Sequence, residues 1–138
     1  MGLKNFVCSP HNMHSLLAML NSGASDNSNT QSELLASLGR AGNIEDLKQL
    51  NGQFVKSYKG TEVEKNLKFG NRMWIAPKYF PKIDKGYKCT IRYFFGSEFA
   101  KLIARNPEKE VNDWVKEVTD GKTNKLIGKF SCLISRNI

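Results

Sequence analysis

The segment "VNDWVKEV" near the end of the printed sequence places one tryptophan and three valines at helical spacing. Val111, Trp114, Val115 and Val118 recur at i, i+3, i+4 and i+7, which is the spacing of one apolar helix face. A face of this size requires a large apolar surface to cover it. Any fold built by this chain must therefore provide such a surface opposite residues 107–119.

Four further segments have helical periodicity or helix-start signals. The sequence predicts helices over residues 10–23, 31–38, 43–59 and 78–96. Ser9 and Thr30 are the expected N-caps of the first two, and Glu33 stands three residues after Thr30, the spacing of a capping box. The first helix is apolar nearly all round, which predicts a buried helix. Pro81 lies in the first turn of the fourth helix, and Gly96 is expected to end it.

Three shorter segments read as strands, because each combines apolar residues with turn-forming neighbours. They cover residues 5–8, 66–76 and 97–104. The predicted order is strand, three helices, strand, helix, strand, helix. This order indicates a mixed α/β fold, helix-rich and with few strands, rather than the regular alternation of a doubly wound sheet.

Length and composition place the chain among globular proteins. Its 138 residues suit one domain. No run of 18 apolar residues occurs, so the sequence predicts no membrane span, and the first ten residues lack the apolar region of a secretory signal. The three cysteines (Cys8, Cys89 and Cys132) are odd in number and widely spaced, which argues against a disulfide framework.

The spacing of Cys8, His11 and His14 is the one pattern that resembles a metal-ligand set. A structural zinc site needs four ligands, and no fourth ligand lies nearby in the sequence. We therefore expect no metal and no cofactor, and interpret Cys8 as a small buried apolar residue. Any nucleophile pair would have to use one of these two histidines, and no nucleophile or phosphate-binding motif is present. The sequence predicts that the chain is not an enzyme.

Charge is unevenly distributed along the chain. The net charge is +8, and residues 78–105 hold seven basic residues against two acidic ones. Such a concentration attracts polyanions, although a solvated lysine-rich face has the same composition. Interleaved tyrosines leave nucleic acid as a less favoured partner. The candidate residues of a polyanion-binding helix are Lys82, Lys85, Lys88 and Arg92.

Three segments, in order and at matching spacing, together resemble the serpin family of serine protease inhibitors. The first is "NFVCSPHNMHSLLAMLNSGASDNSNTQSELLASLG", the second "FGNRMWIAP", and the third "SEFAKLIARNPEKEVNDWVKEVTDGKTNKLI". They resemble the family's strand, Ser-Pro and buried helix, then a strand of its large sheet, then the next strand and the helix that crosses the sheet. The resemblance covers about residues 5–129.

The resemblance implies a mechanism and a compartment. In this family a protease cleaves an exposed reactive loop, which then inserts into the large sheet and drags the acylated protease with it. Serine proteases would be the partners, and the location would be extracellular, with the cytoplasm as the alternative. Ser9 and Pro10 match the family's shutter-like positions, where Asn12 replaces a second serine. Sulfated polysaccharide would contact the helix at residues 43–59, which is poor in lysine.

The reactive loop and the later strands of the family lie beyond the crossing helix. The sequence therefore predicts a partial serpin fold, with residues 1–129 as the N-terminal part of a serpin domain and 130–138 as a divergent tail. We expect a truncated chain that does not inhibit proteases by itself. We also expect the face of Val111, Trp114, Val115 and Val118 to lack most of its sheet, which favours a partly disordered or associating chain.

Overall fold

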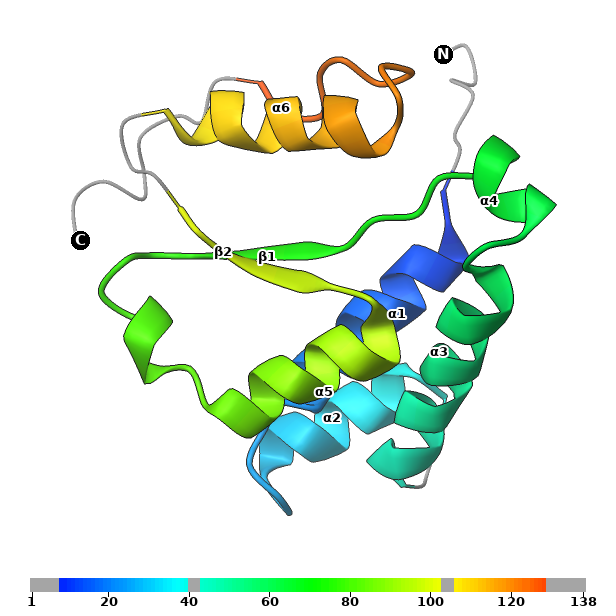
Figure 1. The fold of residues 1–138 in the computed structure, drawn as a ribbon. Coiled ribbons are helices and arrows are strands. Elements are labelled where there is room, and N and C mark those ends of the chain that lie inside the picture. Colours follow the sequence, from blue (N-terminus) through cyan, green and yellow to red (C-terminus); the bar gives the residue numbers. More distant parts are fainter. Residues whose placement is uncertain (1–7, 40–42, 103–105, 129–138) are drawn as a thin grey trace, which may run out of the picture.

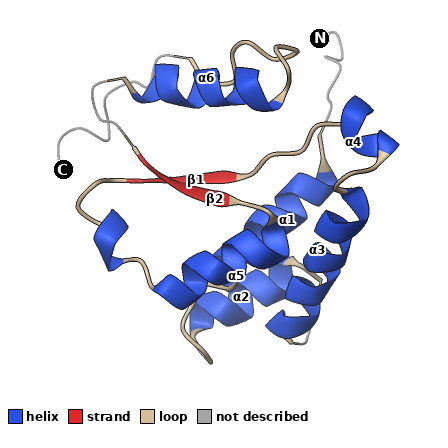
Figure 2. Ribbon diagram, viewed as in Figure 1, coloured by secondary structure: helices blue, strands red, loops and turns tan. Residues whose placement is uncertain are grey.

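A computed structural model describes residues 8–39, 43–102 and 106–128 of the chain. Two parallel strands, β1 (Arg72–Ile75) and β2 (Glu98–Lys101), lie between a single helix on one face and a group of helices on the other (Figures 1 and 2). The single helix is α6 (Pro107–Val118). The group contains α1 (Pro10–Asn21), α2 (Asn29–Ser37), α3 (Ile44–Tyr58) and α5 (Lys85–Phe95). This helix-rich mixed architecture confirms the predicted fold class.

The core lies where α1, α3 and α5 meet beneath the strands. Its buried members, all at most 5% exposed, are Ala18, Met19, Leu47, Ile91 and Phe95. Met73 and Phe99 pack on this cluster from the two strands. Because α3 and α5 approach closely at Gly52, a Cβ there would lie 3.1 Å from the ring of Phe94. This close approach explains a glycine that weakens helix propensity in the middle of α3.

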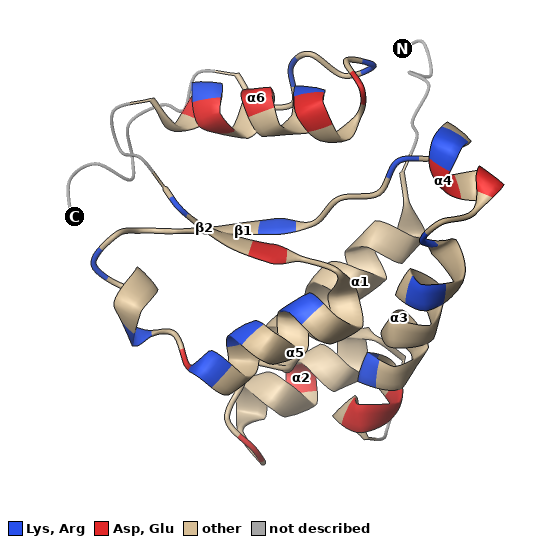
Figure 3. Cartoon of the chain, viewed as in Figure 1, with Lys and Arg blue, Asp and Glu red and all other residues tan. Residues whose placement is uncertain are grey.

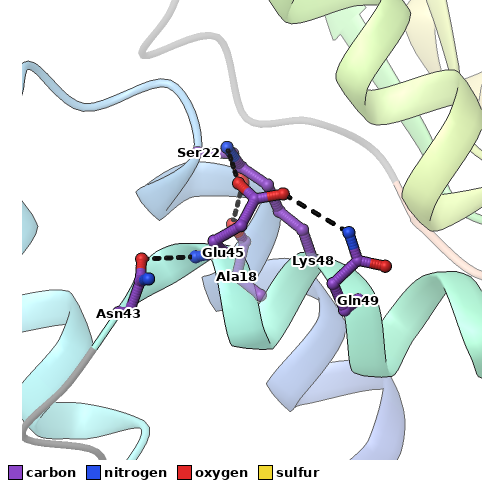
Figure 4. A network of polar contacts seen from close by, with 6 residues as sticks. All are labelled: Ala18, Ser22, Asn43, Glu45, Lys48 and Gln49. Atoms are coloured by element: carbon purple, nitrogen blue, oxygen red, sulfur yellow. Dashed lines mark hydrogen bonds and ion pairs between the residues drawn. The ribbon is translucent and has the colours of Figure 1, made fainter.

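Most helix starts follow from their capping residues. Ser9 accepts a hydrogen bond from the Asn12 backbone N–H, with Pro10 in the first turn of α1, as predicted. Asn43 caps α3, and Glu45 then binds the side chains of Lys48 and Gln49 within the first turns (Figure 4). Each cap satisfies backbone donors that have no partner inside the helix.

The predicted cap of α2 was wrong. Ser28, not Thr30, caps the helix by accepting from the Gln31 N–H at 3.1 Å. The Gln31 side chain in turn accepts a hydrogen bond from the Asn27 N–H. Ser28 and Gln31 are also three residues apart, so a pair of hydrogen bonds similar to a capping box forms two residues earlier than the sequence indicated, with Gln31 bound to the residue before the cap.

The predicted helix over residues 78–96 is divided in two. A 3-10 turn, η1 (Phe80–Lys82), contains Pro81, and α5 begins only after Asp84, whose carboxylate accepts from the Tyr87 N–H. Gly96 ends α5 in the left-handed conformation, as expected. A short helix that the sequence did not indicate, α4 (Glu62–Asn66), follows α3.

Both strands are shorter than predicted, at four residues each. Their parallel register pairs Arg72 with Glu98 and Trp74 with Ala100. The predicted strand at residues 5–8 lies outside the described residues except for Cys8, which is exposed. The interpretation of Cys8 as a buried apolar residue was therefore wrong.

The prediction of a fully buried first helix was also wrong. Ala18 and Met19 are buried, but Met13, Leu16 and Leu20 are 43–57% exposed. These three side chains lie at i, i+3 and i+7 and so share one face of α1. Nothing among the described residues packs over that face closely enough to bury it.

Candidate functional site

Helix α6 lies across the outer face of the strands, and its apolar face points toward them (Figure 1). Val111 and Val115 are buried, at 9% and 6% exposure, and Trp114 is partly buried. The expectation that this face would be exposed was wrong for Val111 and Val115, whereas Trp114 and Val118 are only partly buried. The two strands provide a surface for it, because Gly70, Arg72 and Trp74 are spaced by two residues along β1 and the segment before it, which brings them to the same side.

Two tryptophans form the main contact between α6 and β1. The rings of Trp114 and Trp74 meet edge to face, with centroids 5.1 Å apart and planes at 83°. One turn later, Val118 lies so close to the backbone that a Cβ on Gly70 would stand 2.6 Å from its Cγ1 atom. The helix therefore packs on the strand through one large ring pair and one close backbone approach. Both contacts require that the surfaces of the helix and the strand be complementary in shape.

Arg72 supplies the charge in this contact. Its guanidinium carbon lies 5.1 Å from the Trp114 ring centroid and 5.9 Å from that of Trp74. The same guanidinium binds the Glu98 carboxylate on β2 at 2.8 Å, so it joins both strands to the helix. Cation–π contacts of this kind contribute about 0.5–2 kcal/mol, more where water is excluded.

Polar contacts at both ends hold α6 and the segment after it. Lys68, just before β1, binds Asp120 at 3.0 Å, and this hydrogen bond to Asp120 raises the pKa of the lysine. The Asn112 side chain accepts from the Leu126 and Ile127 N–H groups and donates to the Ile127 carbonyl. Asn112 thereby folds residues 123–128 back along the helix.

A groove of about 380 Å³ remains between α6 and the beginnings of the two strands. Its walls include Phe69 and Gly70 on the strand side and Trp114, Glu117 and Val118 on the helix side. The groove shows that α6 touches the sheet along a narrow line rather than over its whole width.

A second, smaller cavity of about 70 Å³ lies between α1 and α3, beside an aromatic cluster. The His11 ring stands 4.0 Å from Phe54 and 5.5 Å from Phe69, centroid to centroid. Burial, together with the neighbouring His14, lowers the pKa of His11. Beneath it, the buried Ser15 hydroxyl donates to Asn51 at 2.7 Å. The cavity is too small for a drug-sized ligand.

The shutter-like residues lie at the start of α1, next to this cluster. Ser9 and Pro10 form the helix start, and Asn12 contributes its backbone N–H to the cap. Among the described residues, the Asn12 side chain is exposed and makes no hydrogen bond. The role of these three residues in strand opening stays a prediction.

The structure brings the predicted basic residues to one region. Lys82 lies in η1, whereas Lys85, Lys88 and Arg92 share one face of α5 (Figure 3). Lys88 is not free to extend, because its ammonium group donates to the Phe80 carbonyl at 3.2 Å. The lysines of this region therefore gather around the residues of η1 rather than along the helix.

The described residues contain no group of three or more histidine, cysteine, aspartate and glutamate side chains that could hold a metal ion. Within the same ranges, no hydrogen bond joins either histidine to a serine or a cysteine. His11 packs on the aromatic rings of Phe54 and Phe69 instead. No helix in the described part of the chain is long and apolar enough to cross a membrane.

Sequence reasoning missed Arg72, Trp74 and Asn112. A usable signal existed for the first two: Gly70, Arg72 and Trp74 are spaced by two residues in a predicted strand, which puts them on one face. Asn112 gave no comparable signal, since its partners are backbone groups 14 and 15 residues later.

Comparisons with known proteins agree on one family. The family model described as serpin (serine protease inhibitor) matches residues 2–134. AtSerpin1 from Arabidopsis, in its native stressed conformation, superposes with a TM-score of 0.73 at 18% identity, over 89% of this chain and 32% of that one. Native protease nexin-1, solved with heparin, gives 0.72 at 21% identity, over 91% and 34%. The chain thus spans about a third of either structure, and no curated protein matched it.

Proposed function

The chain belongs to the serpin family of serine protease inhibitors, and we propose that it supplies the part of such an inhibitor in which a helix covers the large sheet. In this proposal α6 is the covering helix, and the strands β1 and β2 belong to the sheet that accepts the cleaved reactive loop. The observation that carries the proposal is the seating of Trp114 on Trp74 across the outer face of β1.

The way in which α6 contacts the sheet supports the proposal that this helix moves during inhibition. A loop can insert beside β1 only if α6 yields, and α6 is held by a few side chains over a groove of about 380 Å³. These contacts include one ring pair, one guanidinium and one close backbone approach. All of them are lost at once when α6 moves away from the sheet. A small displacement of α6 therefore releases most of its interaction with the sheet, which suits a two-state element.

We further propose that these 138 residues do not trap a protease by themselves. The mechanism implied by the family needs a reactive loop that follows the covering helix, and it needs further sheet strands on which the loop inserts. The described residues form only two strands, joined through η1 and α5. Inhibition of serine proteases is then a property of a polypeptide in which this segment is joined to those parts.

Incubation with one trypsin-like and one chymotrypsin-like protease tests the proposal. We expect full residual protease activity and no complex that survives SDS, because no acyl-enzyme can be carried across a sheet. A serpin that contains the reactive loop and inhibits the protease used is the positive control under the same conditions. One SDS-stable complex of the 138-residue chain would overturn the proposal that it does not trap.

A further inference from the structure

Residues 67–71 connect α4 to β1 and run below α6 and above the start of α1 (Figure 1). The groove of about 380 Å³ beside α6 lies on one side of this segment, and the cavity of about 70 Å³ between α1 and α3 lies on the other. Phe69, Gly70 and Asn71 line both of them. Strand pairing begins only at Arg72, and Asn71 adds one hydrogen bond of 3.3 Å to β2. A displacement of the segment is therefore opposed mainly by the packing of its side chains.

Two consecutive residues of this segment contact different helices. The Phe69 ring packs toward the start of α1, where the centroid of the His11 ring is 5.5 Å away. Gly70 contacts α6 instead, since a Cβ on it would stand 2.6 Å from Val118 and 3.1 Å from Trp114. Because one planar peptide unit joins the two residues, a displacement of Phe69 also moves the glycine on which α6 rests. His11 and α6 are thus connected through two neighbouring residues.

The surroundings of the His11 ring are aromatic or positively charged. Its centroid lies 4.0 Å from that of Phe54, and both side chains line the cavity. The titratable and charged groups that face it from α1 and α3 are His14, Tyr58 and Lys59. The end of α5, which also lines the cavity, is uncharged, and Lys68 in the segment before β1 is paired with Asp120. No carboxylate among the described residues shifts the pKa of His11, so a proton on this ring has no compensating charge there.

Protonation of His11 weakens its packing in this cluster. Burial and the neighbouring His14 lower the pKa of His11, so the packed ring binds a proton less readily than an exposed ring does. A phenyl face attracts an imidazolium, but less strongly than the water that the charged ring gives up on burial. Acid therefore favours an arrangement in which His11 leaves Phe54 and Phe69 for solvent. Phe69 then loses one of the rings that hold it in place.

We propose that His11 makes the contact between α6 and the sheet sensitive to pH: protonation of its ring loosens Phe69 and Gly70 and lets α6 separate from β1. The inference rests on the proposed function, since it concerns the regulation of the same covering helix, but it requires neither a reactive loop nor a protease. His11 is then a positioning residue that acts on α6 through residues 69 and 70. In a polypeptide that contains the reactive loop, insertion of the loop would be easier in mildly acidic solution than at neutral pH.

Native-state hydrogen exchange of the 138-residue chain between pH 7.5 and pH 5.5 tests the proposal. The measured quantity is the exchange rate of the α6 amides divided by that of the α3 amides, because the chemical exchange rate changes with pH equally for both and cancels. His11→Phe keeps a ring in the cluster but binds no proton, and the adjoining cavity leaves room for it. His11→Gln, which has a smaller neutral side chain, is the second variant. His14→Gln is the matched control, because His11 and His14 are the only histidines in the chain.

In the parent we expect this ratio to rise as pH falls below the ordinary histidine value of about 6.5. The rise should be at most about tenfold per pH unit and should stop below the lower pKa of the packed His11, because only between the two values does the open form bind more protons. Both His11 variants should keep a ratio that is constant within about twofold. His14→Gln should retain a smaller rise, since the burial of His11 remains. Phe69→Leu should raise the ratio already at pH 7.5, because it removes the ring that connects His11 to Gly70.

Three results would overturn the inference. A parent ratio that stays constant over the whole pH range would show that His11 is not coupled to α6. A rise that persists in both His11 variants would assign the effect to another group. A rise that disappears in His14→Gln as completely as in His11→Phe would make His14 the responsible residue. The exchange measurement uses no protease, and the incubation with proteases needs no change of pH, so this inference and the proposed function fail separately.

Discussion

The helices below the sheet and the single helix above it are held in different ways. Below, the buried residues where α1, α3 and α5 meet are at most 5% exposed, and the cavity beside them holds only about 70 Å³. Above, α6 rests on the sheet through a ring pair, a guanidinium and three valines, of which Val111 and Val115 are buried, and a groove of about 380 Å³ lies beside these contacts. Density of packing sets the free energy of local opening, so α6 is expected to separate from the sheet before the lower helices unfold.

The largest expected effect comes from the lower core. Leu47→Ala, at a fully buried position of α3, should lower the free energy of unfolding by about 3–4 kcal/mol, because it leaves a cavity among Met19, Ile91 and Phe95. Leu50→Ala on the same helix is the matched control, since Leu50 is 45% exposed. Urea unfolding followed by circular dichroism measures both. Equal losses at the two positions would contradict the packing that we describe.

A smaller effect is expected from the ring pair above the sheet. Trp114→Ala should lower the unfolding free energy by about 2–3 kcal/mol, since a partly buried ring loses part of its transfer free energy and its contact with Trp74. The helices below should keep their far-ultraviolet signal. Lys116→Ala on the outer side of α6 provides the control and should be within about 0.5 kcal/mol of the parent.

The close approach at Gly70 allows a double-mutant cycle. Gly70→Ala alone should destabilise the chain by about 1–2 kcal/mol, because the new Cβ overlaps Val118. Val118→Ala should relieve that overlap, so the two changes together should be less damaging than their sum by about 0.5 kcal/mol or more. Purely additive effects, measured by urea unfolding, would show that α6 does not seat on this glycine.

The smallest expected effect is a pH dependence below the sheet. Burial and the neighbouring His14 lower the folded-state pKa of His11, so the unfolded chain binds a proton more readily. Stability from this group is therefore full above the unfolded value of about 6.5 and is lost as pH falls through the lower folded pKa. We expect His11→Gln to flatten the change in melting temperature between pH 7.5 and pH 5. His14→Gln should flatten it only in part, because the burial of His11 remains.

Signals within one or two helical turns predicted most of the helices. The other features depend on contacts with residues elsewhere in the chain. Ser9 and Gly96 are capping residues whose effect is confined to one turn, so the sequence was sufficient for those helix ends. The break at Asp84 was missed because Phe80, Ile83 and Tyr87 keep a helical spacing across it. The spacing of apolar residues can continue past a capping residue, whereas the backbone hydrogen bonds of the helix begin only after it.

The strands and the site depended on contacts between distant residues. Residues 66–71 have the composition of a strand, but their pairing begins only at Arg72, where β2 provides a partner. The apolar face of α6 was predicted, and the resemblance implied that it crosses the sheet. The residues that meet it were not predicted, because Trp74 was counted as a strand residue without regard to its side of the sheet. Exposure of Met13, Leu16 and Leu20 could not be anticipated either, since helix periodicity does not say which neighbours are present.

The most direct measurement of the central claim is native-state hydrogen exchange of the 138-residue chain. If α6 is a separately held cover, its amides at positions 111–118 should exchange through an opening of lower free energy than the amides of α3 and α5 around Leu47 and Ile91. Trp114→Ala should lower the former and leave the latter nearly unchanged. A single opening free energy shared by α6 and the lower helices would contradict the claim.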